Sequence, residues 1–160
     1  MQLVCFFLDN QEFGVPIDDV RETIGLRPIT PVFRTPPCIR GIVNLRGEIL
    51  AVLDPAVLLE LTPRQVSDET RIVILEPDER AAGVLVDRLG SIREVEAEAI
   101  AGTPATVPRG VAAMLSGVVS LPERPVGVLS ADRLLSAPEL HPFTRAGRSQ
   151  GSPVTTAEEG

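Results

Sequence analysis

An internal repeat limits the folds that this chain can adopt. Residues 41–59 (GIVNLRGEILAVLDPAVLL) align without a gap with residues 117–135 (GVVSLPERPVGVLSADRLL). Upstream, residues 14–20 (GVPIDDV) match residues 83–89 (GVLVDRL), and the two blocks keep the same order in both halves. A repeat seen only twice indicates two copies of one small fold, because a solenoid needs about three or more units.

The composition favours short strands and turns. The 160 residues are 44% hydrophobic but only 3% aromatic, and they include 13 Gly and 15 Pro. Valine, leucine and isoleucine must therefore form the core, as in all-β folds. Five short antiparallel strands commonly close into a small barrel, because closure removes exposed edges. We expect one domain over residues 1–138, built of two five-stranded SH3-like barrels near 1–65 and 70–137, and a flexible tail over 139–160.

The local patterns predict the same plan in both halves. Asp9-Asn10-Gln11 is a strong turn composition, and Asp18 and Asp54 are good helix N-caps. In the first half we expect strands at 2–8, 12–17, 24–32, 39–45 and 48–53, a helical turn at 18–23 and a helix at 55–61. In the second half we expect strands at 71–75, 82–86, 92–96, 114–121 and 124–129, a helical turn at 97–100, a loop at 102–110 and a helix at 131–135.

The charge argues against two classes of partner. The net charge is -7, and all 15 basic residues are Arg, with no basic run among them. Nucleic acids and anionic membranes both attract proteins through a positive surface, so neither is an expected partner. The N-terminus has no export signal and no apolar run long enough to span a bilayer. We therefore expect a cytoplasmic protein that does not insert into membranes, with Cys5 and Cys38 as unbridged thiols.

The sequence has few residues suited to catalysis. The only His, His141, lies in the predicted tail. No Cys pair has metal-ligand spacing, and no glycine-rich phosphate-binding motif is present. Ser91, Ser116 and Ser120 have neither a nucleophile-elbow motif nor an available His. We expect no enzyme activity, no metal and no cofactor.

The repeat differs between its copies at a turn, where Arg46-Gly47 in the first corresponds to Pro122-Glu123 in the second. Gly suits such a turn, but Arg does not, since a two-residue hairpin turn prefers Asn, Asp or Gly. The donors of Arg suit a bidentate carboxylate, and Glu22 is the expected partner. Phe33, in a Pro-flanked loop, is either a core residue or an interface anchor.

Five segments together resemble the CheW adaptor family of bacterial chemotaxis. They are FFLDNQEFGVPIDDVRETI, PPCIRGIVNLRGEILAVLD, RIVIL, GVLVDRLGSI and SGVVSLPERPVGVLSADRLL, and they span roughly residues 3–136. The most specific parts are the GxxNLRGxxxxxxD and GxxVD patterns. The resemblance implies a fold of two packed five-stranded barrels. It also implies a non-catalytic adaptor that couples the cytoplasmic tip of a methyl-accepting chemoreceptor to a CheA-like histidine kinase.

The resemblance also implies roles for individual residues. Val20, Glu22 and Arg46 are expected on the receptor-facing side, with Glu22 and Arg46 as an ion pair. Gly41 and Asn44 are expected at the kinase contact.

Two stretches depart from the family pattern, AVLDP after the first hairpin and RPVGVLSADRLL at the end of the second. They favour, as an alternative, a scaffold of a non-flagellar pathway, such as surface motility or second-messenger control. A nucleic-acid-binding small barrel is the other alternative, and the acidic charge opposes it.

Overall fold

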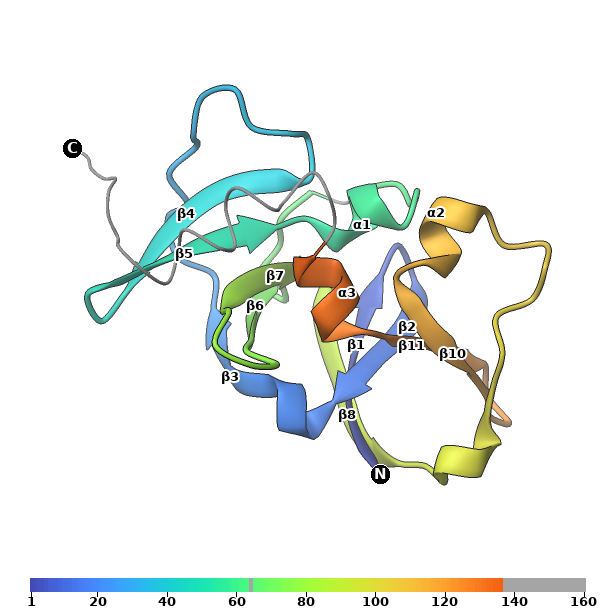
Figure 1. The fold of residues 1–160 in the computed structure, drawn as a ribbon. Helices are drawn as coiled ribbons and strands as arrows, with labels where there is room; N and C mark the ends of the chain where they lie inside the picture. Colours follow the sequence, from blue (N-terminus) through green and yellow to red (C-terminus); the bar gives the residue numbers. More distant parts are fainter. Residues whose placement is uncertain (64, 137–160) are drawn as a thin grey trace.

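Within residues 1–63 and 65–136, which the structure describes, the computed structural model contains two β-sheets and a few short helices (Figure 1). The first half contributes β1 (Gln2–Leu8), β2 (Gln11–Pro16), β3 (Val20–Gly25), β4 (Ile39–Leu45), β5 (Glu48–Leu53) and α1 (Pro55–Leu58). The second half contributes β6 (Arg71–Leu75), β7 (Ala82–Val86), β8 (Arg88–Glu94), β9 (Ile100–Ala101), α2 (Arg109–Ala112), β10 (Leu115–Ser120), β11 (Pro125–Leu129) and α3 (Ala131–Leu135). The all-β class is as predicted.

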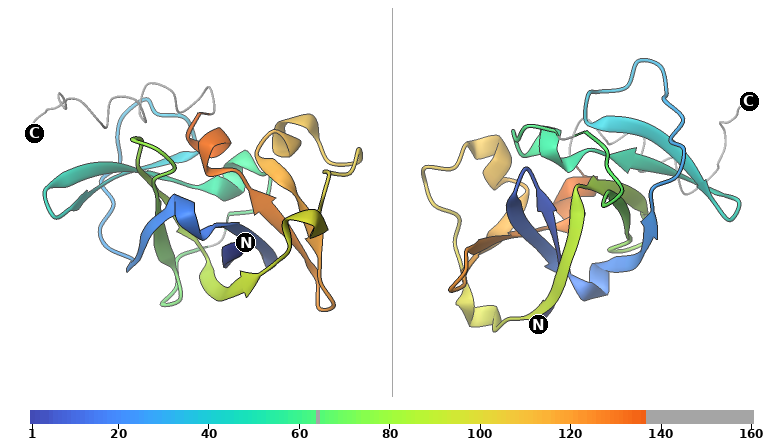
Figure 2. Two further views of the ribbon diagram at one scale, coloured as in Figure 1. Left: turned by 60° about the horizontal axis from the view of Figure 1, so that its bottom comes forward. Right: turned by 180° about the vertical axis from the view of Figure 1, so that it is seen from behind.

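The strands form two units that lie side by side (Figures 1 and 2). The six-stranded sheet, here called sheet A, has the order β8-β1-β2-β11-β10-β9. The five-stranded sheet, here called sheet B, has the order β3-β6-β7-β5-β4. Most neighbours are antiparallel, but β11 pairs with β2 in parallel, and β5 pairs with β7 in parallel. The prediction of two small β units packed together is confirmed in this form.

The predicted boundary between the units is wrong. Barrels built from residues 1–65 and 70–137 would each use strands of one half, but both sheets contain strands of both halves. The hairpin β1–β2 joins β8–β11 in sheet A, and the hairpin β6–β7 joins β3–β5 in sheet B. The two halves thus exchange their first hairpins. The repeat is real, because Gly14 pairs with Val128 as Gly83 pairs with Val52, but each unit is assembled from both copies.

Local chemistry explains the turns and caps. Asp9 and Asn10 connect β1 to β2 with positive φ angles of 50° and 64°, which Asn and Asp tolerate better than most residues. The Asp54 side chain accepts a hydrogen bond from the Ala56 amide at 3.2 Å and caps α1. Ser130 caps α3 in the same way, at 3.2 Å from the Arg133 amide. These caps occur at equivalent places after β5 and β11.

Several elements differ from the prediction. The helical turn predicted at 18–23 is confined to a 3-10 turn at Ile17–Asp19, and β3 begins at Val20. The strand predicted at 24–32 ends at Gly25, and only Thr30 forms a bridge, to Ile42. Helix α2 was not predicted, because its segment contains Pro and Gly. The predicted tail at 139–160 and His141 lie outside the described residues.

The core accounts for the packing of the two sheets. One buried cluster lies inside sheet B, around Leu50, Val52 and Ile72, and another lies inside sheet A, around Leu3 and Val128. A third and larger cluster takes residues from both sheets and from α3. The third cluster joins the sheets into one domain, because burying apolar surface from both sheets stabilises the fold by about 25 cal/mol per Å2 of surface buried. Cys5 and Cys38 are buried, and no disulfide joins them, as expected.

Candidate functional site

The turn between β4 and β5 is a strained place for an arginine. Leu45 pairs with Glu48, so Arg46 and Gly47 form a two-residue turn, and both have positive φ angles, of 52° and 90°. Hairpin turns of this kind, in which both central residues have positive φ angles, favour Asn, Asp or Gly at both positions. A long side chain such as that of Arg is not favoured there. The Asn44 side chain supports the turn, because its Oδ1 accepts a hydrogen bond from the Gly47 amide at 2.8 Å. The turn therefore needs Gly47 and Asn44 but does not need Arg46.

Arg46 and Glu22 form the expected ion pair. The Arg46 Nη2 lies 2.5 Å from Glu22 Oε2, and Nη1 lies 3.4 Å from Oε1, so the contact is bidentate. The hydrogen bond from Arg46 holds the pKa of the Glu22 carboxyl below its usual value. The Arg46 side chain remains 67% exposed. A pair this open contributes little to stability, so its guanidinium is available to a partner.

A second ion pair lies beside the first. Arg21 is next to Glu22 in β3, and it donates to Glu48 at 2.8 and 3.2 Å and to Glu76 at 2.9 Å. Hydrogen bonds from its guanidinium to these two carboxylates raise the pKa of Arg21. Sequence reasoning did not identify Arg21, although its place beside Glu22 was a signal.

The ion pairs Arg21–Glu48 and Arg46–Glu22 connect the two edge strands of sheet B. Strands β3 and β4 are its first and last strands, and no backbone ladder joins them among the described residues. Arg21 and Glu22 of β3 reach Glu48 and Arg46 at the tip of the β4–β5 hairpin. Positive and negative side chains alternate on β3 and at the hairpin, so each Arg meets a Glu. This pairing specifies the register between β3 and the hairpin tip. Figure 2 shows β3 and this hairpin on the same side of the molecule.

Val20 is placed differently from Glu22 and Arg46. It begins β3, pairs with Leu75, and packs partly buried against the cluster shared by the two sheets. Its side chain is therefore at the junction of the sheets, while the ion pair lies at the hairpin tip. The structure brings Glu22 and Arg46 together. Among the described residues, no polar contact joins Val20 to either of them.

Gly41 has a packing explanation. Thr30 and Ile42 exchange two backbone hydrogen bonds of 2.9 Å, which brings the Thr30 carbonyl close to β4. A Cβ at Gly41 would lie 2.2 Å from that oxygen, and its φ of 145° also disfavours other residues. The equivalent Gly117 has the same need, with the Ala101 oxygen at 2.3 Å. Gly41 is thus required by the fold, and the predicted kinase contacts of Gly41 and Asn44 remain predictions.

Sheet A has a different arrangement at the matching hairpin. Glu12 is almost fully buried, and Arg93 holds it through Nε at 2.8 Å and Nη2 at 3.3 Å. Glu123, at the β10–β11 loop, lies 3.8 Å from Arg93, so here the acid is on the hairpin and the Arg is on the strand. Sequence reasoning missed Glu12 and Arg93, because a single Glu in a strand usually faces solvent.

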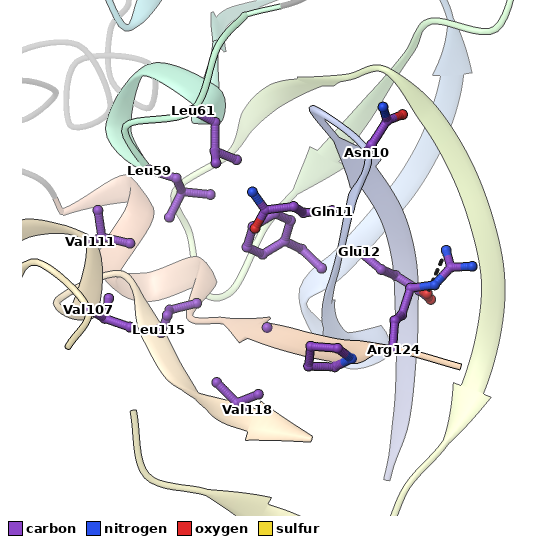
Figure 3. A pocket seen from close by; sticks show the side chains of 13 residues that line it. Asn10, Gln11, Glu12, Leu59, Leu61, Val107, Val111, Leu115, Val118 and Arg124 are labelled. Carbon is purple, nitrogen blue, oxygen red and sulfur yellow. Dashed lines mark ion pairs between the residues drawn. The ribbon is translucent and has the colours of Figure 1, made fainter. Parts of the chain in front are cut away.

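A cavity of about 470 Å3 lies beside Glu12. Figure 3 shows the side chains that line it. Its walls are largely apolar, and Leu59, Leu61 and Val111 lie together on the side away from Glu12 and Arg124. The Arg124 side chain lies 3.6 Å from the Glu12 carboxylate at its polar end. Phe7, close by, stacks under Arg88 at 3.6 Å and under Arg124 at 5.1 Å.

Some features bear on other classes of function. Phe33 is 96% exposed, so of its two interpretations the core role is wrong. In the part of the chain that the structure describes, no group of His, Cys, Asp and Glu is placed to hold a metal ion. None of the described helices has the length and apolarity that a membrane crossing requires.

Comparison with known proteins identifies a family. A family model described as a CheW-like domain matches residues 2–139. The chain is 29% identical over 139 residues to the chemotaxis protein CheW of Klebsiella aerogenes, covering 87% of this chain and 84% of that protein. It is 29% identical over 138 residues to a probable chemotaxis protein CheW of Rhizobium etli, covering 86% and 89%. The crystal structure of the scaffolding protein TtCheW from Thermoanaerobacter tengcongensis matches with a TM-score of 0.73 at 28% identity, covering 81% of this chain and 84% of that one.

Proposed function

This chain belongs to the CheW-like family of chemotaxis adaptors, and we propose that it couples a chemoreceptor to a CheA-type histidine kinase. It is a non-catalytic protein, in keeping with the scaffolding role named for its structural relative. The proposed partners are the cytoplasmic tip of a methyl-accepting chemoreceptor and the kinase itself. The proposed place of action is the inner face of the membrane, where such receptors end.

One observation carries the proposal beyond the family match. Arg46 occupies a turn position that its backbone conformation disfavours, and it pairs with Glu22 in the open. A strained position that the fold does not require is typical of a functional site. The matching turn of the second copy has no such residue, so the site belongs to sheet B alone. Val20, Glu22 and Arg46 are the proposed receptor contacts, and Gly41 and Asn44 are the proposed kinase contacts.

Reconstitution tests the proposal directly. The full chain would be mixed with receptor signalling tips and with the full-length kinase taken from the same cell. We expect binding to each partner and an increase in kinase autophosphorylation only when all three are present. Failure to bind either partner, with the protein shown to be folded, would refute the proposal. A pull-down from the native cell, identified by mass spectrometry, would name the receptor and therefore the output of the pathway.

A further inference from the structure

Arg27, in the segment that follows β3, has a buried donor without a partner. Its Nε is covered by protein, yet no hydrogen-bond acceptor meets it in the described structure. A buried N–H left unpaired costs about 1–3 kcal/mol, so native proteins seldom keep one without a reason. Glu22 attracts Arg27 through its charge, but no hydrogen bond joins the two within the described residues. The Nη groups of the same guanidinium likewise have no hydrogen-bond partner among the described residues, and they are not buried, so a ligand from outside can reach Arg27 through them.

Arg27 lines a small hollow on the outer side of sheet B. The hollow holds about 250 Å3. Arg27, Pro28 and Thr30 form one wall, while Ile42, Val43, Asn44 and Ile49 of the β4–β5 hairpin form the other. No acidic side chain is among these residues, so nothing in the hollow itself neutralises Arg27.

Asn44 adds a second donor. Its Oδ1 already accepts a hydrogen bond from the Gly47 amide, which fixes the orientation of the side-chain amide. The Nδ2 group makes no recorded hydrogen bond within the described residues, so its protons remain free to donate. Two sets of donors and no acid make a site for an anion. A carboxylate fits the fork of Arg27 in particular, since guanidinium and carboxylate pair through parallel hydrogen bonds.

The rest of the rim is apolar. Ile49 is 48% exposed, so a large aliphatic side chain lies open at this rim. A free inorganic anion would gain nothing from this side chain, whereas a protein surface would bury it together with the ion pair. Covering an ion pair between Arg27 and a partner's carboxylate would also strengthen it, because the attraction between charges grows as water is removed.

We propose that the hollow between Arg27 and the β4–β5 hairpin binds an Asp or Glu side chain of the kinase, with Arg27 and Asn44 as its donors. The inference rests on the proposed function, because Asn44 belongs to the surface assigned to the kinase. It adds the chemistry of the contact and a residue, Arg27, that determines which partners fit. An aliphatic residue next to the acid would cover Ile49.

The first test uses acetate alone and does not need the kinase. The Nε–Hε resonance of Arg27, assigned by its loss in Arg27→Gln, would be followed during titration with sodium acetate against sodium chloride of equal ionic strength. We expect a saturable shift for Arg27 and none for Arg109, an exposed residue of α2. Asn44→Asp keeps the acceptor for Gly47 but removes the donor, so it should abolish the saturation. Equal, unsaturable shifts for Arg27 and Arg109 would overturn the proposal.

The second test measures affinity for the full-length kinase. Arg27→Gln and Asn44→Asp should each weaken binding by about tenfold or more, as hot-spot residues do. Arg109→Gln, which also removes one positive charge, should bind like the original protein. If Arg27→Gln binds as tightly as the original protein, the proposal is wrong while the adaptor function stands. If the original protein does not bind the kinase at all, the proposed function fails, and the acetate titration decides the chemistry of the hollow independently.

Discussion

The guanidinium of Arg46 forms two hydrogen bonds to the carboxylate of Glu22 across sheet B. Arg46 lies at the tip of the β4–β5 hairpin, and Glu22 lies in β3, the edge strand on the other side of the sheet. Arg46 achieves this from a left-handed backbone conformation with a φ of 52°. The contact is exposed, and the fold closes the equivalent hairpin of sheet A with a loop of different sequence. Arg46 therefore has a strained backbone and contributes little to stability. Its substitution should impair function without impairing folding.

Arg46→Ala should leave the fold intact and weaken receptor coupling. An exposed pair contributes little to stability, whereas an Arg covered at an interface can contribute about 2 kcal/mol or more to binding. We expect a loss of affinity of about tenfold or more, at about 1.4 kcal/mol per decade. Glu22→Ala should cost less, and the double variant should be no worse than Arg46→Ala if the pair acts as a unit. Binding to receptor tips and kinase activation would measure this, and normal coupling by folded Arg46→Ala would contradict it.

Gly41→Ala should destabilise the protein. Its Cβ would collide with the Thr30 carbonyl, and the φ of 145° adds strain, so we expect a loss of about 2 kcal/mol or more. Gly25→Ala is the matched control, because a Cβ there meets nothing within 4 Å. Urea unfolding of both variants would compare them. Similar stabilities would show that Thr30 can move aside, and a loss of kinase binding in Gly41→Ala alone would not demonstrate a contact.

Arg93→Ala should cost more stability than Glu12→Ala. Without Arg93, the Glu12 carboxylate stays buried with Arg124 at 3.6 Å as its remaining recorded ion pair, and we expect a loss of about 3 kcal/mol. Without Glu12, Arg93 can turn toward solvent and Glu123, so the loss should be nearer 1 kcal/mol. Chemical denaturation would give both values. An equal or reversed order would show that the buried carboxylate is not the costly member of the pair.

Asp78 should contribute stability that acid removes. Hydrogen bonds from the Arg80 side chain lower the pKa of Asp78 from 3.8 to about 2. The unfolded chain therefore binds more protons than the folded protein between these values, so stability falls as pH drops through this window. Asp78→Asn should be less stable at neutral pH, by under about 1 kcal/mol because the side chain is exposed, and should match the original protein near the lower value. Unfolding curves across this pH range would test it, and a deficit that persists in strong acid would contradict it.

Cys5 should resist alkylation until the protein unfolds. Burial, and then the nearby Glu12 carboxylate, raise the pKa of the Cys5 thiol to about 12. The reactive thiolate is scarce at such a value, and the side chain is only 1% exposed. Peptide mass spectrometry after brief treatment with a maleimide would show Cys5 unmodified in the native protein and fully modified in denaturant. Rapid labelling under native conditions would indicate local opening of β1.

Part of this structure follows from short-range sequence alone. The turns at Asp9-Asn10 and Arg46-Gly47, the cap at Asp54 and the strands 71–75 and 82–86 depend on neighbouring residues, and the sequence predicts them. Glu22 was predicted as the partner of Arg46 because the donors of Arg suit a carboxylate and because the resemblance to the CheW family implies the pair. The repeat likewise announces that two similar units exist, since each copy must bury the same apolar positions.

The tertiary structure decided which strands make each unit. The parallel pairings β2–β11 and β5–β7 join residues that are far apart in the chain, and nothing in a local pattern distinguishes them from pairings within one half. Two halves with a similar apolar pattern offer similar partners for each hairpin, and in the exchanged arrangement the shared cluster packs residues of both halves together. For the same reason the buried Glu12–Arg93 pair and the hollow beside Arg27 appear only when strands distant in sequence come together.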